Sequence, residues 1–192
     1  ARGVEDVANK HDYRVIFCNT DEDLKKQHNY IDVFRSRIVD GFILAGASED
    51  DPQLLETNHI VPYVLVDRKI ANLHADAVVV DNRRGAYKAV NHLLGKGYRR
   101  IGFVAGKRDT LTGRERLQGY IDAHQEAGVA IDEDLIVDGV FTIEGGFQAT
   151  KRILALDNRP DALFVSNNSM AIGCLKALSV LGLRIPYDIA FI

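Results

Sequence analysis

Short apolar runs alternate with longer amphipathic stretches along almost the whole chain of 192 residues. The runs are rich in Val, Ile and Phe, which is typical of strands buried on both faces of a parallel sheet. The stretches between them repeat apolar residues at helical spacing. The alternation therefore predicts an α/β fold with parallel sheets. Strands are predicted at 13–19, 41–46, 63–67, 77–81, 101–105, 135–139, 162–166 and 189–192, and helices at 4–10, 21–37, 49–58, 84–95, 113–127, 144–156 and 168–181.

The alternation is repeated on either side of Gly97-Tyr98, which predicts two lobes, 1–97 and 98–192. A single doubly wound sheet is the alternative architecture. In open α/β sheets, ligands bind in a crevice at the carboxyl ends of the strands. A ligand of a two-lobed fold is therefore expected in the cleft that these strand ends would line.

Composition describes a globular chain with a sizeable core, because 46% of the residues are hydrophobic and 27% are charged. No apolar run is long enough to cross a bilayer. The formal net charge is -3, and neither lobe carries an excess of basic residues, so these residues are not expected to hold DNA by themselves. Cys18 and Cys174 are isolated and lie among apolar residues, which favours buried thiols in a reducing compartment.

Motifs for catalysis are missing from the sequence. It contains no nucleophile elbow, no phosphate-binding loop, no dinucleotide fingerprint after a strand and no zinc-protease motif. Its six histidines have no partner histidine at helical spacing. We therefore expect no enzymatic activity, no metal site and no cofactor. The histidines are His11, His28, His59, His74, His92 and His124.

Thr112 and Arg116 are four residues apart and share a face of the helix that follows strand 101–105. Thr112 and Glu115 have the spacing of a capping box that would begin this helix. An arginine in a first turn opposes the helix dipole, so a ligand rich in oxygen would give its donors a role. The alternative is an exposed arginine paired with Glu115 or Asp109.

Phe141 and the run Asn167-Asn168-Ser169 each stand between an apolar strand and a helix. The Phe141 ring could stack on a sugar or a base, or it could close the core. At least one side chain of the run is expected to be an N-cap, and a remaining amide could bind a hydroxyl group. Alternatively, all three residues only cap the helix and turn the chain. Asp81, which ends a strand, is by default a hydrogen-bonded structural carboxylate.

Several segments, taken in order, resemble the effector-binding core of LacI/GalR-type transcription regulators. They are VDGFILAG at 39–46, VVVDNRRGAYKAVNHLLGKG at 78–97, GYRRIGFVAG at 97–106, FVSNNSMAIGCLKAL at 164–178 and GLRIPYDIAFI at 182–192. The resemblance covers essentially the whole chain.

The resemblance implies a periplasmic-binding-protein-like (type I) fold whose two lobes close on a small effector. It implies a cytoplasmic, homodimeric regulator without membrane contact. A helix-turn-helix domain, absent from this chain, would bind DNA, and effector binding would alter the affinity for the operator. We expect the chain to be truncated at both ends, with the family's first strand before Ala1 and an acidic ligand contact after Ile192.

The resemblance also implies roles for individual residues. Thr112 and Arg116 stand at the positions that hold the effector, Phe141 at the aromatic that stacks on it, and Asn167 at the amide that binds its hydroxyl groups. The RLQGY context of Arg116 favours a sugar effector. Further candidates are Asp81, Ser169 and Arg84, although Arg84 stands where some sugar-binding members carry an acidic residue.

The alternative function is that of a periplasmic or extracellular sugar-binding protein of a transporter, which has the same fold without the DNA-binding domain. The residues upstream of Ala1 would distinguish the two functions. A helix-turn-helix there would indicate a regulator, and a signal peptide would indicate a secreted binding protein.

Overall fold

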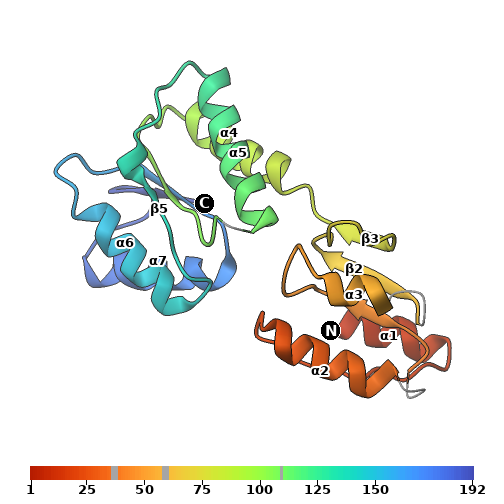
Figure 1. The fold of residues 1–192 in the computed structure, drawn as a ribbon. Helices are drawn as coiled ribbons and strands as arrows, with labels where there is room; N and C mark the ends of the chain where they lie inside the picture. The colour runs from red at the N-terminus through yellow and green to blue at the C-terminus, as the bar shows by residue number, and fades with distance from the viewer. Residues whose placement is uncertain (36–38, 58–60, 109) are drawn as a thin grey trace. The chain divides into compact units, whose positions relative to one another are not determined.

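The computed structural model describes residues 1–35, 39–57, 61–108 and 110–192. It contains two compact units, unit 1 (Ala1–Val79) and unit 2 (Val80–Ile192), and each is described by itself (Figure 1). The predicted ends of two helices, at Arg37 and Asn58, lie outside the described residues.

Unit 1 is built on a three-stranded parallel sheet in the order β1-β2-β3. One face of this sheet packs against α2 and α3, where Ile31, Leu54 and Leu65 are buried together. This half of the chain therefore has a core of its own. Its elements are α1 (Arg2–Lys10), α2 (Leu24–Arg35), β1 (Phe42–Leu44), α3 (Pro52–Thr57), β2 (Tyr63–Asp67) and β3 (Asp76–Val79).

Two features of unit 1 differ from the sequence prediction. The strand expected at 13–19 is not formed, and Ile16 and Phe17 there are 56% and 55% exposed. A strand needs a neighbour to satisfy its backbone hydrogen bonds, and no described strand pairs with this segment. Ile43 and Val78 are also exposed, so the expected cover on both sheet faces is incomplete in unit 1.

Unit 2 is built on a four-stranded parallel sheet in the order β5-β4-β6-β7. Helices α4 and α5 lie on one side of this sheet and α6 and α7 on the other (Figure 1). This is the doubly covered parallel sheet that the apolar strands predict. Its elements are α4 (Asn82–Gly95), β4 (Ile101–Val104), α5 (Leu111–Glu126), η1 (Glu133–Leu135), β5 (Ile136–Val137), α6 (Ile143–Leu154), β6 (Ala162–Val165), α7 (Asn168–Val180) and β7 (Ala190–Phe191).

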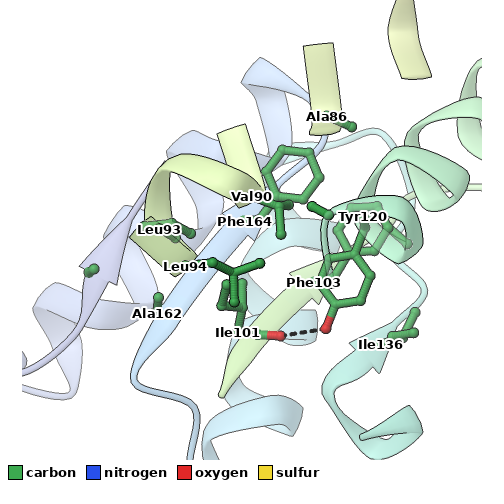
Figure 2. Close-up of a cluster of buried hydrophobic side chains, with 13 residues drawn as sticks. Ala86, Val90, Leu93, Leu94, Ile101, Phe103, Tyr120, Ile136, Ala162 and Phe164 are labelled. Carbon is green, nitrogen blue, oxygen red and sulfur yellow. Dashed lines mark hydrogen bonds between the residues drawn. The ribbon is translucent and has the colours of Figure 1, made fainter. Parts of the chain in front are cut away.

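An aromatic stack fills the core between the sheet and the α4–α5 pair. The Phe103 ring lies 5.2 Å from that of Tyr120 and 4.9 Å from that of Phe164, between ring centroids (Figure 2). The buried Tyr120 hydroxyl donates a hydrogen bond to the Ile101 carbonyl at 2.8 Å. Phe103 and Ile101 lie on β4 and Tyr120 lies on α5, so the ring contact and the hydrogen bond hold α5 against the sheet. They thereby also position the other residues of α5.

The boundary between the compact units follows Val79, whereas the sequence predicts it after Gly97. Helix α4 belongs to unit 2 because its apolar residues Ala86, Val90 and Leu93 are buried in the same cluster as the aromatic stack. Gly97, at a φ of +97°, lies just beyond the end of α4.

Candidate functional site

The four main predicted site residues all lie in unit 2, on segments that follow its strands. Thr112 and Arg116 lie on α5 after β4, Phe141 follows β5, and Asn167 follows β6. Parallel strands end at one edge of their sheet, so these segments meet there.

At this edge, Arg116 donates hydrogen bonds to two neutral oxygen atoms, among its other interactions. Its Nε donates to Oδ1 of Asn82 at 2.9 Å, and its Nη1 donates to the Ser166 carbonyl at 2.8 Å. The guanidinium group therefore connects the start of α4 with the end of β6. Of the two alternative partners, Glu115 accepts a hydrogen bond from Asn82 Nδ2 at 3.1 Å, and Asp109 lies outside the described residues.

The predicted capping box at Thr112 and Glu115 is wrong. The N-cap of α5 is Thr110, whose hydroxyl accepts from the Gly113 amide at 3.2 Å. The helix thus begins earlier than predicted, and Thr112 is left 3% exposed, one turn before Arg116. The Thr112 hydroxyl group therefore lies on the buried face of α5. A hydrogen bond to a buried hydroxyl group contributes more free energy than one at the surface, because a buried polar group without a partner is costly.

Phe141 is half-buried beside the loop that follows β4. Its ring packs at the margin of the cluster that contains Val104 and Met170. It also lies against Gly106, whose φ is +70°, and a side chain added to Gly106 would collide with the ring. Phe141 therefore contributes to the core and remains partly exposed, so a stacking role is still a proposal.

Asn167 is the N-cap of α7. Its Oδ1 accepts from the amides of Ser169 at 2.8 Å and Met170 at 3.2 Å, which confirms that this run caps the helix. The oxygen is thereby used, and the two hydrogens of Nδ2 have no acceptor within the part of the chain that the structure describes. The side chain of this half-buried residue can donate to a ligand oxygen.

The other predicted candidates lie at helix starts. Oδ1 of Asp81 caps α4 by accepting from the Arg84 amide at 3.0 Å, so Asp81 has the structural role that its position predicts. The side chains of Asp81 and Arg84 are exposed, and Ser169 is half-buried at the start of α7. The effector roles of these residues are proposals.

Asn82 is a residue of this site to which the sequence pattern assigns no role. It is 6% exposed, and its side chain bonds to Arg116, Glu115 and the Val80 carbonyl. The sequence feature that could have indicated a role for Asn82 is the pair Asp81-Asn82 at the start of a helix. One of these two side chains is enough to cap the helix, so the other is available for a different role.

Neither cysteine lies in a metal or redox arrangement, and no group of three or more His, Cys, Asp or Glu side chains among the described residues could hold a metal ion. Cys174 is buried, as predicted, and burial raises the pKa of its thiol. Cys18 is exposed, contrary to the prediction, because the segment around it forms no strand. A hollow of about 530 Å³ lies in unit 1, beside Tyr63 and His74, and none of the predicted site residues lines it.

Two consecutive α/β units with parallel sheets, the second carrying polar side chains at its strand ends, are the architecture of two-lobed α/β binding proteins. All 192 residues match the family model described as periplasmic binding proteins and sugar binding domain of LacI family. The chain belongs to this family. Its resemblance to LacI/GalR-type regulators and its α/β periplasmic-binding-protein-like fold are therefore confirmed.

Three similar proteins illustrate the relationship. The HTH-type transcriptional repressor PurR of Pasteurella multocida (strain Pm70) is 33% identical over 191 residues, which are 98% of this chain and 57% of that protein. The crystal structure of transcription regulator CcpA of Lactococcus lactis has a TM-score of 0.88 at 29% identity, covering 99% of this chain and 70% of that one. The transcriptional regulator CelR–cellobiose complex has a TM-score of 0.85 at 29% identity, covering 98% and 58%.

These similar proteins are transcriptional repressors and regulators. The chain spans little more than half the length of the curated relatives that it matches. None of the described helices is both long and apolar enough to span a membrane.

Proposed function

We propose that this chain is the effector-binding and dimerising core of a cytoplasmic, sugar-responsive transcription regulator. The core acts without catalysis. DNA is bound through a helix-turn-helix domain outside these 192 residues, and closure of the two units on the effector changes the affinity for the operator. The names of relatives such as the HTH-type repressor PurR support this proposal, as does the net charge of -3, which is unsuited to holding DNA directly.

The observation that carries the proposal is the fixed orientation of Arg116. Its bonds to Asn82 and Ser166 hold the guanidinium group before any ligand arrives. A donor that is already oriented loses little conformational entropy on binding. Arginine also presents several N–H groups in one plane, which suits neighbouring oxygens of a sugar.

A sugar agrees with the chemistry of the other candidate residues. The Nδ2 group of Asn167 is a donor for a hydroxyl group, and the partly exposed ring of Phe141 offers an apolar face to a pyranose or furanose. Thr112 adds a hydroxyl group one turn before Arg116. The cellobiose bound to CelR supports the same class of effector.

The regulatory mechanism follows from linkage. A sugar can shift the equilibrium between two arrangements of the units only by binding one of them more tightly. The same difference in affinity then appears as a change in operator affinity. A secreted sugar-binding protein of a transporter would use the same site, but the similar proteins named above are regulators, which favours the regulatory function.

A thermal-shift screen of the protein made from the complete open reading frame tests this function. The panel contains D-ribose, D-glucose, cellobiose, sugar phosphates and nucleobases. We expect a sugar to raise the melting temperature, because a ligand that binds only the folded state stabilises it. A response to nucleobases alone would contradict the sugar assignment.

Arg116→Ala is expected to abolish that shift and leave the melting transition cooperative. Losing hydrogen bonds from a charged donor costs about 1.5–3 kcal/mol each, which lowers affinity roughly 10- to 150-fold. Arg114→Ala, an exposed arginine on the same helix, is the control and should respond like the wild type. If Arg116→Ala lowers the melting temperature of the free protein and the same sugar still raises it, Arg116 stabilises the fold and does not bind the effector.

A further inference from the structure

Asn82 connects three parts of unit 2 through one buried amide side chain. Its Oδ1 accepts from Arg116 Nε at 2.9 Å, and its Nδ2 donates to Glu115 Oε2 and to the Val80 carbonyl, both at 3.1 Å. The side chain belongs to the first residue of α4, and two of its partners lie on α5. An amide can make all three bonds at once because it is both a donor and an acceptor.

The Val80 carbonyl lies at the junction between the two compact units. Val79 is the last residue of β3, where it pairs with Asp67, and Val80 is the first residue of unit 2. Both the backbone amide of Asn82, at 2.9 Å, and its Nδ2 donate to that carbonyl. The chain is therefore fixed by the sheet of unit 1 on one side of the Val79–Val80 peptide and by Asn82 on the other.

We propose that Asn82 is a positioning residue that couples Arg116 to the junction at Val80. It orients the guanidinium group, and the same side chain sets the backbone through which the chain leaves unit 1. A change in the position of Arg116 is thereby transmitted to Val80 through two bonds of one amide. The regulatory part of this inference rests on the proposed function, whereas the positioning part can be measured without any effector.

Arg83 offers a matched control. It neighbours Asn82 on α4, and its side chain also bonds across to α5, through an ion pair with Asp122. Among the described residues, the Arg83 side chain forms no hydrogen bond or ion pair with Arg116 or Val80. Arg83→Ala therefore removes a link between the same two helices and leaves the Asn82 bonds in place. If Asn82→Ala acted only by weakening the packing of α4 on α5, Arg83→Ala would have a similar effect.

The first measurement is the hydrogen exchange of the Arg116 Nε–H, followed by nitrogen-15 NMR on the protein from the complete open reading frame. The resonance is assigned by its loss in Arg116→Lys. We expect Asn82→Ala to speed this exchange at least about tenfold, because its acceptor is gone. Arg83→Ala, which keeps the Asn82 acceptor, should remain close to the wild type. Unchanged exchange in Asn82→Ala would overturn the positioning role.

The second measurement is the distribution of distances between the units by single-molecule energy transfer. One dye is attached to Cys18, which is exposed in unit 1, and the other to Lys176→Cys on the exposed side of α7. Asn82→Ala cannot donate to the Val80 carbonyl through its side chain, so we expect it to broaden the distribution. Arg83→Ala should not. A wild-type distribution in Asn82→Ala would overturn the link to the junction.

Titration calorimetry with cellobiose, and then with D-ribose, connects these results to binding. We expect Asn82→Ala to weaken sugar binding about tenfold and Arg83→Ala to change it less than about twofold. Unaltered affinity in Asn82→Ala would contradict the coupling of Asn82 to the site. If the wild type binds no sugar in this experiment or in the thermal-shift screen, the proposed function fails, while the exchange and distance measurements still decide the role of Asn82.

Discussion

His124 is a titratable side chain buried in unit 2, 1% exposed. Its Nδ1 lies 2.9 Å from the Tyr120 carbonyl, and its ring packs on that of Tyr120 at 4.2 Å between centroids. Burial lowers the pKa of His124, because the charged imidazolium loses its solvation, and this outweighs the hydrogen bond to Tyr120. The folded state therefore favours neutral His124.

The sign of the resulting pH dependence is fixed by that direction. As pH falls below about 6.5, the ordinary pKa of histidine, the unfolded chain takes up a proton before the folded chain does. The contribution of His124 to stability is therefore complete above that pH and is lost as pH falls towards the lowered pKa of the folded state. We expect the melting temperature of the wild type to fall between pH 7.5 and 5.5.

His124→Gln is expected to make that fall smaller, since glutamine does not titrate. His92→Gln changes an exposed histidine of α4 and serves as the control. Calorimetric melting curves of the three proteins at both pH values provide the measurement. An equal pH dependence in His124→Gln and the wild type would exclude His124 as its source.

At the scale of elements, close contact between α4 and α5 determines where Arg116 lies. Gly119 of α5 faces the α4 backbone, and a Cβ there would collide with the Arg83 carbonyl and the Tyr87 amide. Gly85 of α4 has open space where its Cβ would be. The two glycines therefore differ in what they contribute, although both lie within helices.

Gly119→Ala is expected to destabilise the protein by about 1–3 kcal/mol, because the helices must separate to admit the methyl group. Gly85→Ala should instead be neutral or stabilising by up to about 1 kcal/mol, because alanine favours a helix over glycine. Urea denaturation gives both free energies of unfolding. Equal effects of the two substitutions would show that helix propensity, and not the contact, dominates.

At the scale of the whole molecule, the position of α4 defines which fragment can fold. Residues 80–192 contain α4 and the complete cluster around Phe103, whereas residues 98–192 lack the α4 side chains that cover this cluster. The buried residues that α4 contributes are Ala86, Val90, Leu93 and Leu94.

We expect the fragment 80–192 to unfold cooperatively and the fragment 98–192 to lack a cooperative transition. Without α4, apolar surface around Ile101 and Phe164 would be exposed to water, at a cost of about 25 cal/mol per Å². Circular dichroism during thermal unfolding distinguishes the two. A cooperative transition of 98–192 would instead support the boundary after Gly97 that the sequence predicts.

The alternation of apolar strands and helices was sufficient to predict the fold of unit 2. All of its predicted strands and helices are present. In this unit the secondary structure favoured by the local periodicity is the same as that favoured by packing helices on both faces of the sheet. The strand expected at 13–19 was not formed, since an apolar run becomes a strand only beside a partner. The compact units divide after Val79, whereas the predicted lobes divide after Gly97, because a sequence shows which face of α4 is apolar but not which unit that face covers.

For the candidate site, the sequence by itself determined that polar residues follow the strands, and Thr112, Arg116, Phe141 and Asn167 lie there. Only the tertiary structure decided that Asn82 contacts Arg116, since their bond joins residues 34 positions apart on two helices. Caps and strand ends depend on neighbours in sequence, whereas the orientation of a guanidinium group depends on oxygens that the packing of α4, α5 and β6 brings together.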